Sequence, residues 1–253
     1  MSALPLQQLA MDEPVQFTSL SLTNVQYNPS DRLSYISAWL ALAPQALCIM
    51  YVTLIWASRE AEITLMFAGQ MGCEVLNWSL KRLIREERPR RGVVGKGYGM
   101  PSSHSQFVAF FSLYLTLFLL LRHQTGSVTS SSPSTFAERL GLSLLALVCA
   151  LSVAASRVYL NYHTPRQVWV GFAVGLFCAV AWFLATTYLR KAGWLEWALE
   201  TPLARRLRFR DLLLTEDLQD AGWEQFQQRR LKKRTLRASG ALPTSKSNAK
   251  KAK

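Results

Sequence analysis

The sequence predicts an all-α fold, a polytopic integral membrane helical bundle with about five transmembrane helices. Half of the 253 residues are hydrophobic, and they gather in long stretches that hold almost no charge. The chain carries 29 Lys and Arg against 16 Asp and Glu, and the positive residues are densest near the C-terminal end. Long apolar stretches followed by a basic end are typical of a membrane protein with a cytosolic tail.

Five stretches come close to the ~20 apolar residues that a helix needs to cross a bilayer. They cover residues 36–57, 61–80, 105–121, 140–155 and 168–189. The second stretch also carries Glu62, Gln70, Glu74 and Asn77, and the third and fourth are short unless their polar flanks continue the helix. Runs such as FVAFFSLYLTLFLLL have no polar face to turn towards water, which argues against a soluble protein with long core helices.

The predicted spans divide the chain into an N-terminal segment (1–32), a membrane-embedded domain (33–190) and a basic tail (191–253). The first 30 residues have neither the basic start nor the continuous apolar core of a signal peptide. In the tail, WLEWALETPLARRLRFRDLLL is amphipathic enough to lie on a membrane surface. The end of the tail, RRLKKRTLRASGALPTSKSNAKKAK, is expected to be disordered.

Local motifs mark two helix starts. The sequence TFAE from Thr135 to Glu138 is a capping box that opens the fourth span. Thr164, Pro165 and Gln167 form a second box, with proline in the first helical turn, that opens the fifth span. The four cysteines all fall in apolar spans and form no C-x-x-C pair, so they are expected to be small buried hydrophobes without metal or disulfide.

Two polar interruptions lie on one side of the membrane if the five spans alternate in direction. The first, residues 81–103, holds seven cations: Lys81, Arg82, Arg85, Arg88, Arg90, Arg91 and Lys96. The second covers residues 156–167. Because the tail carries more positive charge and should stay cytosolic, this face holds its cations for a reason other than topology. Arg and Lys bind phosphate oxygens well, and attraction to anionic headgroups is the simpler alternative.

Two of the three histidines, His104 and His163, lie on that same face. Near neutral pH a histidine can serve as nucleophile, base or acid, and two of them beside a cluster of cations fit phosphoryl transfer to water. Pro101 is expected in a first helical turn, with the amides of Ser102, Ser103 and His104 turned towards an anion. The face has no carboxylate cluster for Mg²⁺, so a reaction without metal or other cofactor is predicted.

Three sequence blocks carry a resemblance to a known family. They are K-x6-R-P through Lys81, Arg88 and Pro89, P-S-x-H through Pro101, Ser102 and His104, and S-R-x5-H through Ser156, Arg157 and His163. In this order and spacing they resemble the type 2 phosphatidic acid phosphatase superfamily of integral membrane lipid phosphatases. The stretches LTNVQY, LNWSLK, KGYGMPSSHSQF and SRVYLNYHTPRQV are similar to its dolichyldiphosphatase branch.

The resemblance implies a role for each motif residue. Lys81, Arg88 and Arg157 would bind phosphate, Ser102 would donate a hydrogen bond to it, His104 would be the general acid and His163 the nucleophile. The implied substrate is a polyisoprenoid diphosphate lipid, dolichyl diphosphate, hydrolysed at the lumenal face of the endoplasmic reticulum to recycle the carrier for protein N-glycosylation. The expected partners are this lipid and the membrane, and no nucleic acid.

Other functions stay open at this point. The alternatives are a broader lipid phosphatase, acting on phosphatidic acid or another isoprenoid diphosphate, and a lipid-binding protein or transporter without turnover. The first 31 residues have acidic residues and no Lys or Arg, which predicts a lumenal N-terminus and a cytosolic C-terminus. The final KKAK fits a dilysine retrieval signal read from the cytosol.

The motifs depart from the family at two positions. Ser103 takes the place of a glycine and is still expected at the phosphate site. Gln167 takes the place of an aspartate that would orient the nucleophile, so it either orients His163 or only caps the helix, and one side chain is not expected to do both. Glu74 shares a helix face with Lys81 and is expected to pair with Lys81 or Arg157, with a direct catalytic role as the alternative.

Overall fold

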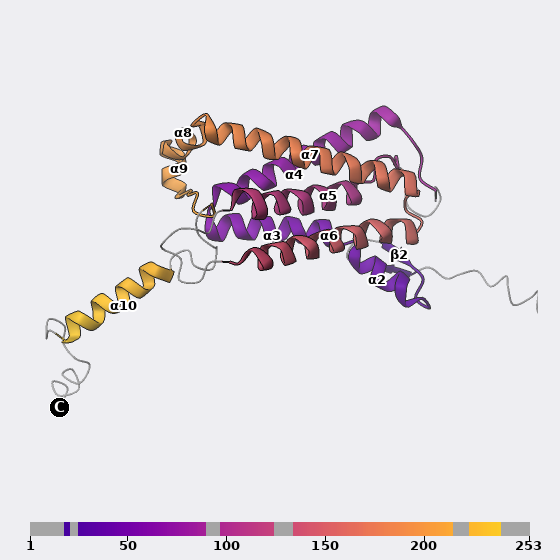
Figure 1. Cartoon of the computed structure of the whole chain (residues 1–253). Helices are drawn as coiled ribbons and strands as arrows, with labels where there is room; N and C mark the ends of the chain where they lie inside the picture. The colour runs from indigo at the N-terminus through magenta and orange to yellow at the C-terminus, as the bar shows by residue number, and fades with distance from the viewer. Residues whose placement is uncertain (1–17, 21–24, 90–96, 124–133, 215–222, 239–253) are drawn as a thin grey trace, which may run out of the picture.

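The computed structural model describes residues 18–20, 25–89, 97–123, 134–214 and 223–238 of the chain. Long helices lie roughly side by side in one bundle (Figure 1). The elements in chain order are β1 (Thr18–Leu20), β2 (Val25–Tyr27), α2 (Arg32–Leu40), α3 (Ala43–Ser58), α4 (Ala61–Ile84), α5 (Ser103–Leu117), the π-helical turn η1 (Phe118–Arg122), α6 (Phe136–Tyr159), α7 (Pro165–Lys191), α8 (Trp194–Glu200), α9 (Pro202–Leu207) and α10 (Trp223–Ala238).

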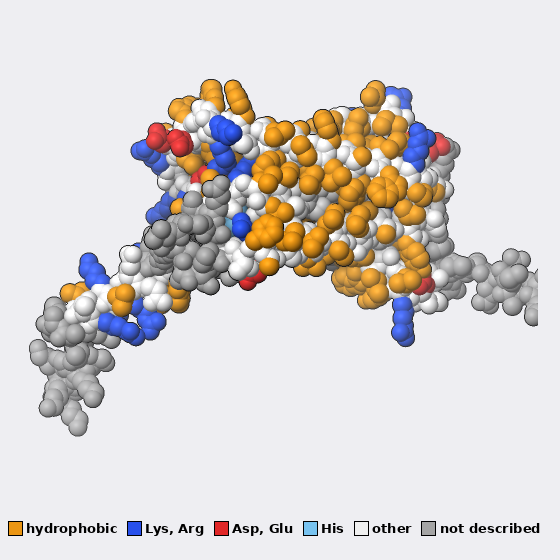
Figure 2. Space-filling view, in the orientation of Figure 1, with side chains coloured by type: hydrophobic (Ala, Val, Ile, Leu, Met, Phe, Trp, Pro, Cys, Tyr) orange, Lys and Arg blue, Asp and Glu red, His pale blue; other side chains and the backbone are white. Residues whose placement is uncertain are grey.

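The predicted all-α membrane bundle is confirmed. Four of its helical stretches are long and apolar enough to cross a membrane: 32–58 (α2 with α3), 103–122 (α5 with η1), α6 and α7. Hydrophobic side chains cover the face of the bundle seen in Figure 2, while Lys and Arg gather towards its ends. Large apolar residues that point outward, such as Trp56 at 77% exposed and Phe177 at 73%, suit a surface that faces lipid.

The second predicted span, α4, has the length of the others but not their composition. Its polar residues lie along the helix from Glu62 to Arg82, so it falls outside the four apolar spans. It packs against α3, α5 and α7, and its polar residues Glu62, Gln70 and Asn77 are buried in the bundle. There Asn77 donates to the Gln106 amide oxygen of α5 at 2.6 Å, and the Gln106 amide donates to the Cys73 carbonyl at 2.7 Å. Polar residues in α4 therefore pair inside the bundle instead of facing lipid.

The helix ends follow the sequence signals closely. The third and fourth spans do continue through their polar flanks, and both capping boxes, Thr135 with Glu138 and Thr164 with Gln167, are formed. Pro101 is a correction: it precedes the N-cap residue Ser102 and does not lie in the first turn of α5. All four cysteines are free, but only Cys73 is buried as predicted; Cys48 and Cys178 are partly exposed, and Cys149 is exposed on α6.

Two regions differ from the sequence prediction. A short antiparallel hairpin, β1 with β2, precedes the first helix of an otherwise helical fold. The last part of the tail was expected to be disordered, yet α10 runs through residues 223–238. Gln, Arg, Lys and Leu fill this helix, and all four have high helix propensity, so local preference outweighs the low hydrophobicity there. The final KKAK lies outside the described residues.

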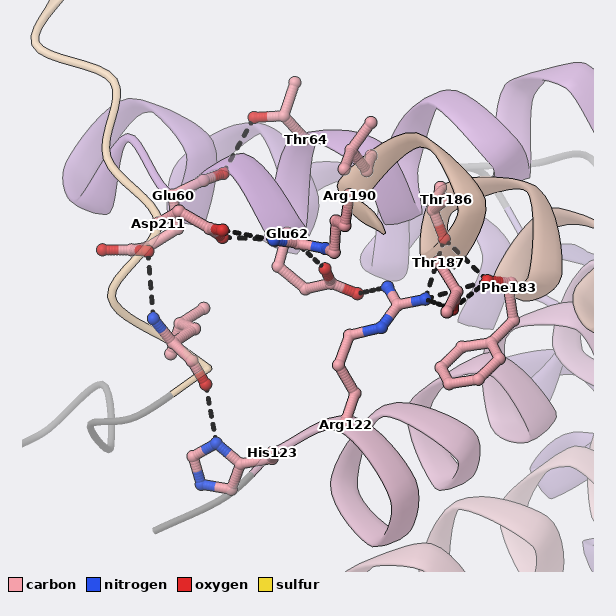
Figure 3. A network of polar contacts seen from close by, with 12 residues as sticks. Glu60, Glu62, Thr64, Arg122, His123, Phe183, Thr186, Thr187, Arg190 and Asp211 are labelled. Atoms are coloured by element: carbon pink, nitrogen blue, oxygen red, sulfur yellow. Dashed lines mark hydrogen bonds and ion pairs between the residues drawn. The ribbon is translucent and has the colours of Figure 1, made fainter. Parts of the chain in front are cut away.

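A buried ionic network closes the end of the bundle where α4 begins and α7 ends (Figure 3). Glu62 accepts from Arg122 at 2.7 Å and from Arg190, and Arg190 also pairs with Asp211. The side chains of Glu62 and Arg122 are only 3% and 7% exposed. Beside them, Glu60 accepts from the amide of Leu212 at 2.9 Å. The segment after α9 is thereby fastened to the bundle.

Replacing Glu62 by alanine should destabilise the protein strongly. The change leaves two buried guanidinium groups without their shared carboxylate, and breaking a buried ion pair costs about 3–5 kcal/mol. Thermal unfolding in detergent should show this as a lower midpoint for Glu62→Ala than for Glu196→Ala, which removes an exposed carboxylate on α8. Equal midpoints for the two variants would contradict a stabilising role for the network.

Candidate active site

Four helix ends bring the sequence motifs together at the opposite end of the bundle from the ionic network (Figure 1). These are the C-terminal ends of α4 and α6 and the N-terminal ends of α5 and α7. Lys81 lies in the last turn of α4, Arg157 in the last turn of α6, and His104 in the first turn of α5. The described parts of the two polar interruptions therefore lie at one end, as the alternating direction of the spans predicted.

Close packing of α7 on α5 holds two of the motif blocks in register. A Cβ atom at Gly171 would lie 2.5 Å from the Ser102 carbonyl oxygen, and one at Gly175 would lie 2.3 Å from the Gln106 carbonyl oxygen. Only glycine lets the backbones approach this closely. At the same contact the Ser102 amide donates to the Gln167 carbonyl oxygen at 3.1 Å.

Three cationic side chains lie near the ring of His163. Lys81, Arg88 and Arg157 all lie close enough for their charges to act on it. Arg157 is 2% exposed, and its hydrogen bonds go to the Ser37 carbonyl and the Ser156 hydroxyl, both at 3.4 Å. The buried Nε of Arg88 has no hydrogen-bond partner within the described part of the chain, and burial lowers the pKa of this guanidinium. A bound anion would complete such a cluster.

His163 is held as a neutral ring with a defined tautomer. Burial, followed by the charge of Arg88, lowers its pKa from 6.5 to about 4, so the ring carries no charge near neutral pH. Its Nδ1 lies 3.2 Å from the Gln167 side-chain oxygen. The Gln167 nitrogen faces two acceptors, the Glu86 carboxylate at 2.9 Å and the Glu87 carbonyl at 2.8 Å, which fixes the amide orientation. Nδ1 must then carry the hydrogen, and Nε2 keeps a free lone pair.

Gln167 performs both of the roles that the sequence left as alternatives. Its side-chain oxygen accepts from the Thr164 amide at 3.3 Å, which closes the capping box, and from His163 Nδ1. A carbonyl oxygen has two lone pairs, so one atom can do both. The expectation that one side chain could not cap the helix and orient the ring was therefore wrong.

The second histidine, His104, lies beside the junction of α2 and α3. Its Nε2 is 3.1 Å from the Ala41 carbonyl oxygen, which can only accept, so Nε2 carries a hydrogen. Ser102, the N-cap residue, is fully buried, and its hydroxyl accepts from Ser105 at 3.2 Å. Because the Ser102 amide is already bonded to Gln167, the predicted anion site at the start of α5 keeps the amides of Ser103 and His104 but not that of Ser102.

A cavity of about 430 Å³ opens next to His104 between α3, α4 and α5. Its wall is mainly apolar and includes Cys48, Ile49 and Phe107, while Glu74 supplies a carboxylate. Glu74 was expected to pair with Lys81 or Arg157. It lies near enough to Lys81 for their charges to interact, but among the described residues it forms no ion pair, and its buried Oε1 has no hydrogen-bond partner.

Sequence reasoning missed two residues at this site. Glu86 binds the Gln167 amide, and its position in the block REERP, an acidic pair among cations, was a signal that could have been followed. Tyr162 has its ring 5.2 Å from the Arg157 guanidinium and accepts from the Gln26 amide at 2.8 Å. The further cations Arg90, Arg91 and Lys96 lie outside the described residues.

Replacing Gln167 by alanine should have two separable effects. Loss of the cap should lower the free energy of unfolding by about 1 kcal/mol. Loss of the acceptor for Nδ1–H should let both tautomers of His163 form, which ¹⁵N chemical shifts of the ring report. Glu138→Ala removes the same capping-box position from α6, where no histidine depends on it. It should lower stability in the same way and leave the His163 shifts unchanged, and a Gln167 variant with unchanged shifts would contradict the orienting contact.

Comparison with known proteins identifies the family and relatives of this chain. Residues 63–191 match the model of the PAP2 superfamily. A provisionally named dolichyldiphosphatase of Neurospora crassa is 46% identical over 89% of this chain and 97% of its own length. Dolichyldiphosphatase 1 of Homo sapiens is 42% identical over 68% of this chain and 73% of its own, and the dolichyldiphosphatase of Saccharomyces cerevisiae is 31% identical over 82% and 88%.

A solved structure, a transmembrane PAP2 type phosphatidylglycerolphosphate phosphatase from Bacillus subtilis, is 23% identical with a TM-score of 0.49, covering 62% of this chain and 76% of that one. The family match covers all three motif blocks. The hairpin and the tail lie outside it. With the matching relatives and the helical membrane bundle, this shows that the chain belongs to the PAP2 superfamily.

Proposed function

We propose that this protein is a phosphohydrolase that removes the terminal phosphate of dolichyl diphosphate, leaving dolichyl phosphate and inorganic phosphate. The observation that carries the proposal is the group of buried Arg157 and half-buried Lys81 and Arg88 near the neutral, buried ring of His163. Buried cations beside a ring with a free lone pair suit attack on a phosphate group. The relatives named dolichyldiphosphatase supply the substrate class.

The roles of the site residues follow from their chemistry. The three cations hold the phosphate oxygens, and Ser102 and Ser103 donate hydrogen bonds to them. His163 Nε2 attacks the terminal phosphorus and forms a phosphohistidine, which water then hydrolyses. His104 acts as the imidazolium: it gives its Nδ1 proton to the leaving oxygen of dolichyl phosphate and keeps the Nε2 hydrogen on the Ala41 carbonyl. The reaction uses no metal ion or other cofactor, because the cations supply the stabilising charge.

The cavity beside His104 suits the other end of the substrate. Its mainly apolar wall, formed by α3, α4 and α5, can receive the first isoprene units that follow the diphosphate. Glu74 lines this cavity and acts on Lys81 through its charge, so we assign it a supporting role at the base of the site. The lipid then enters from the bilayer and not from water.

A substrate panel in detergent tests the assignment. Purified protein should release phosphate faster from dolichyl diphosphate than from dolichyl phosphate or phosphatidic acid, and a strong chelator should leave the rate unchanged. Faster hydrolysis of phosphatidic acid would favour a broader lipid phosphatase, and no release from any of them would favour a lipid-binding protein. Loss of activity on chelation, restored by a divalent ion, would overturn the metal-free mechanism.

Replacing His163 by asparagine should lower kcat by at least about 10³-fold, because the nucleophile is lost. Inhibition by inorganic phosphate should persist, since the three cations remain. His104→Asn should cost about 10²–10⁴-fold. His123→Asn is the matched control, because the third histidine lies in the ionic network, where its Nδ1 donates to the Leu213 carbonyl at 2.6 Å. Activity of the His163 variant close to that of the His123 variant would remove His163 from the mechanism.

We also infer that the site faces the lumen of the endoplasmic reticulum and that the C-terminus is cytosolic. The strongly basic tail supports this orientation, since Lys and Arg are retained on the cytosolic side. An odd number of spans then leaves the N-terminus and both histidines on the lumenal side. A C-terminal tag in sealed microsomes should be open to protease, and protection of that tag would refute the orientation.

A further inference from the structure

Glu86 lies behind Gln167, on the opposite side of the amide from His163. We propose that Glu86 is a positioning residue that polarises the Gln167 amide, so that two side chains together do what one carboxylate beside the nucleophile would do. The inference rests on the proposed function, because it concerns the nucleophile of that reaction. It assigns a purpose to an acidic residue in a block that otherwise supplies cations.

The hydrogen bonds run in one direction through the three side chains. The Gln167 nitrogen donates to Glu86 Oε1 at 2.9 Å, and the Gln167 oxygen lies 3.2 Å from His163 Nδ1, which donates to it. An ionised carboxylate can only accept, so it demands the NH₂ group of the amide and turns the amide oxygen towards the ring. Gln167 is fully buried, and Glu86 is half-buried at its outer side.

The backbone around Glu86 is built to hold this contact. Arg85 ends α4 in the left-handed region with φ of 54°, which turns the chain at Glu86 back towards the start of α7. The Gly99 amide donates to the Glu86 carbonyl at 2.6 Å. A Cβ atom at Gly99 would lie 2.7 Å from the Gln167 amide oxygen. The residue that binds the Glu86 carbonyl therefore also packs closely against the Gln167 side chain.

Charge is what Glu86 adds beyond orientation. The Glu87 carbonyl and the Thr164 amide already fix which way the Gln167 amide points. When His163 forms a bond to phosphorus, its ring becomes positive while Nδ1 keeps its hydrogen. A negative group at the far end of the hydrogen-bonded chain polarises the amide and stabilises that positive ring, and a neutral amide alone does so less well.

A double-mutant cycle tests the proposal. Glu86→Gln keeps the size and a hydrogen-bond acceptor but removes the charge, so kcat should fall roughly tenfold with KM within about twofold of wild type. In a Gln167→Ala background the same change should have no further effect, because Glu86 acts through Gln167. Glu196→Gln, which removes an exposed carboxylate on α8, should leave kcat unchanged in both backgrounds.

Other outcomes would overturn the proposal. The first is a kcat for Glu86→Gln within about twofold of wild type. The second is a double variant whose loss of kcat equals the two single losses combined, since Glu86 would then act independently of Gln167. The third is a change in KM alone, which would assign Glu86 to substrate binding. If Glu86→Gln does not fold, Glu86→Asp draws the carboxylate back from the amide and should give the same loss of kcat. If Glu86→Asp folds and keeps full activity, the proposal is wrong.

The cycle also separates this inference from the proposed function. It can be run on any phosphate ester or anhydride that the wild-type protein hydrolyses, so a wrong substrate assignment does not affect it. If the wild type hydrolyses none, the proposed function fails, and the contact is tested by the ¹⁵N shift of His163 Nδ1. That shift should move in Glu86→Gln and not in Glu196→Gln, and an unmoved shift would show that the charge does not reach the ring.

Discussion

The hydrogen bond from the Ser102 amide to the Gln167 carbonyl, 3.1 Å long, is the contact on which the geometry of the site depends. It joins the start of α5, which carries His104, to the start of α7, which follows His163. Gly171 makes the contact possible, because any side chain there would collide with the Ser102 backbone. Two histidines that are 59 positions apart in sequence are thus set by one backbone contact between two helices.

Buried charged side chains have different partners at the two ends of the bundle. At one end Glu62 is shared by Arg122 and Arg190, and Asp211 completes the pairing, so positive and negative groups compensate each other. At the other end Arg157 is buried with carbonyl, hydroxyl and aromatic neighbours, and among the described residues it forms no ion pair. Burying unpaired charge is costly, and a structural role would favour pairing as in the ionic network. The end that holds Arg157 is therefore where we propose that an anionic ligand binds.

Much of this fold and part of the site follow from local sequence rules. Apolar length predicts the spans, and the boxes at Thr135 and Thr164 predict helix starts, because both depend on residues close in sequence. Alternation of spans then places Arg157 and His163 at the same end as Lys81. The contacts that sequence did not predict, Glu86 with Gln167, His104 with Ala41 and Glu62 with Arg190, join residues 63 to 128 positions apart and depend on how the chain turns between helices.

Gln167 shows why such contacts matter for chemistry. From the sequence, a glutamine is expected to stabilise His163 less well than a carboxylate would, because an amide carries no charge. In the folded protein its nitrogen lies against Glu86, so the charge is present but one side chain further from the ring. The same amide oxygen also accepts from the Thr164 amide and so closes the helix cap. Gln167 thereby caps α7, fixes the tautomer of His163 and contacts the Glu86 carboxylate. The stability of α7 and the orientation of the proposed nucleophile therefore depend on the same side chain.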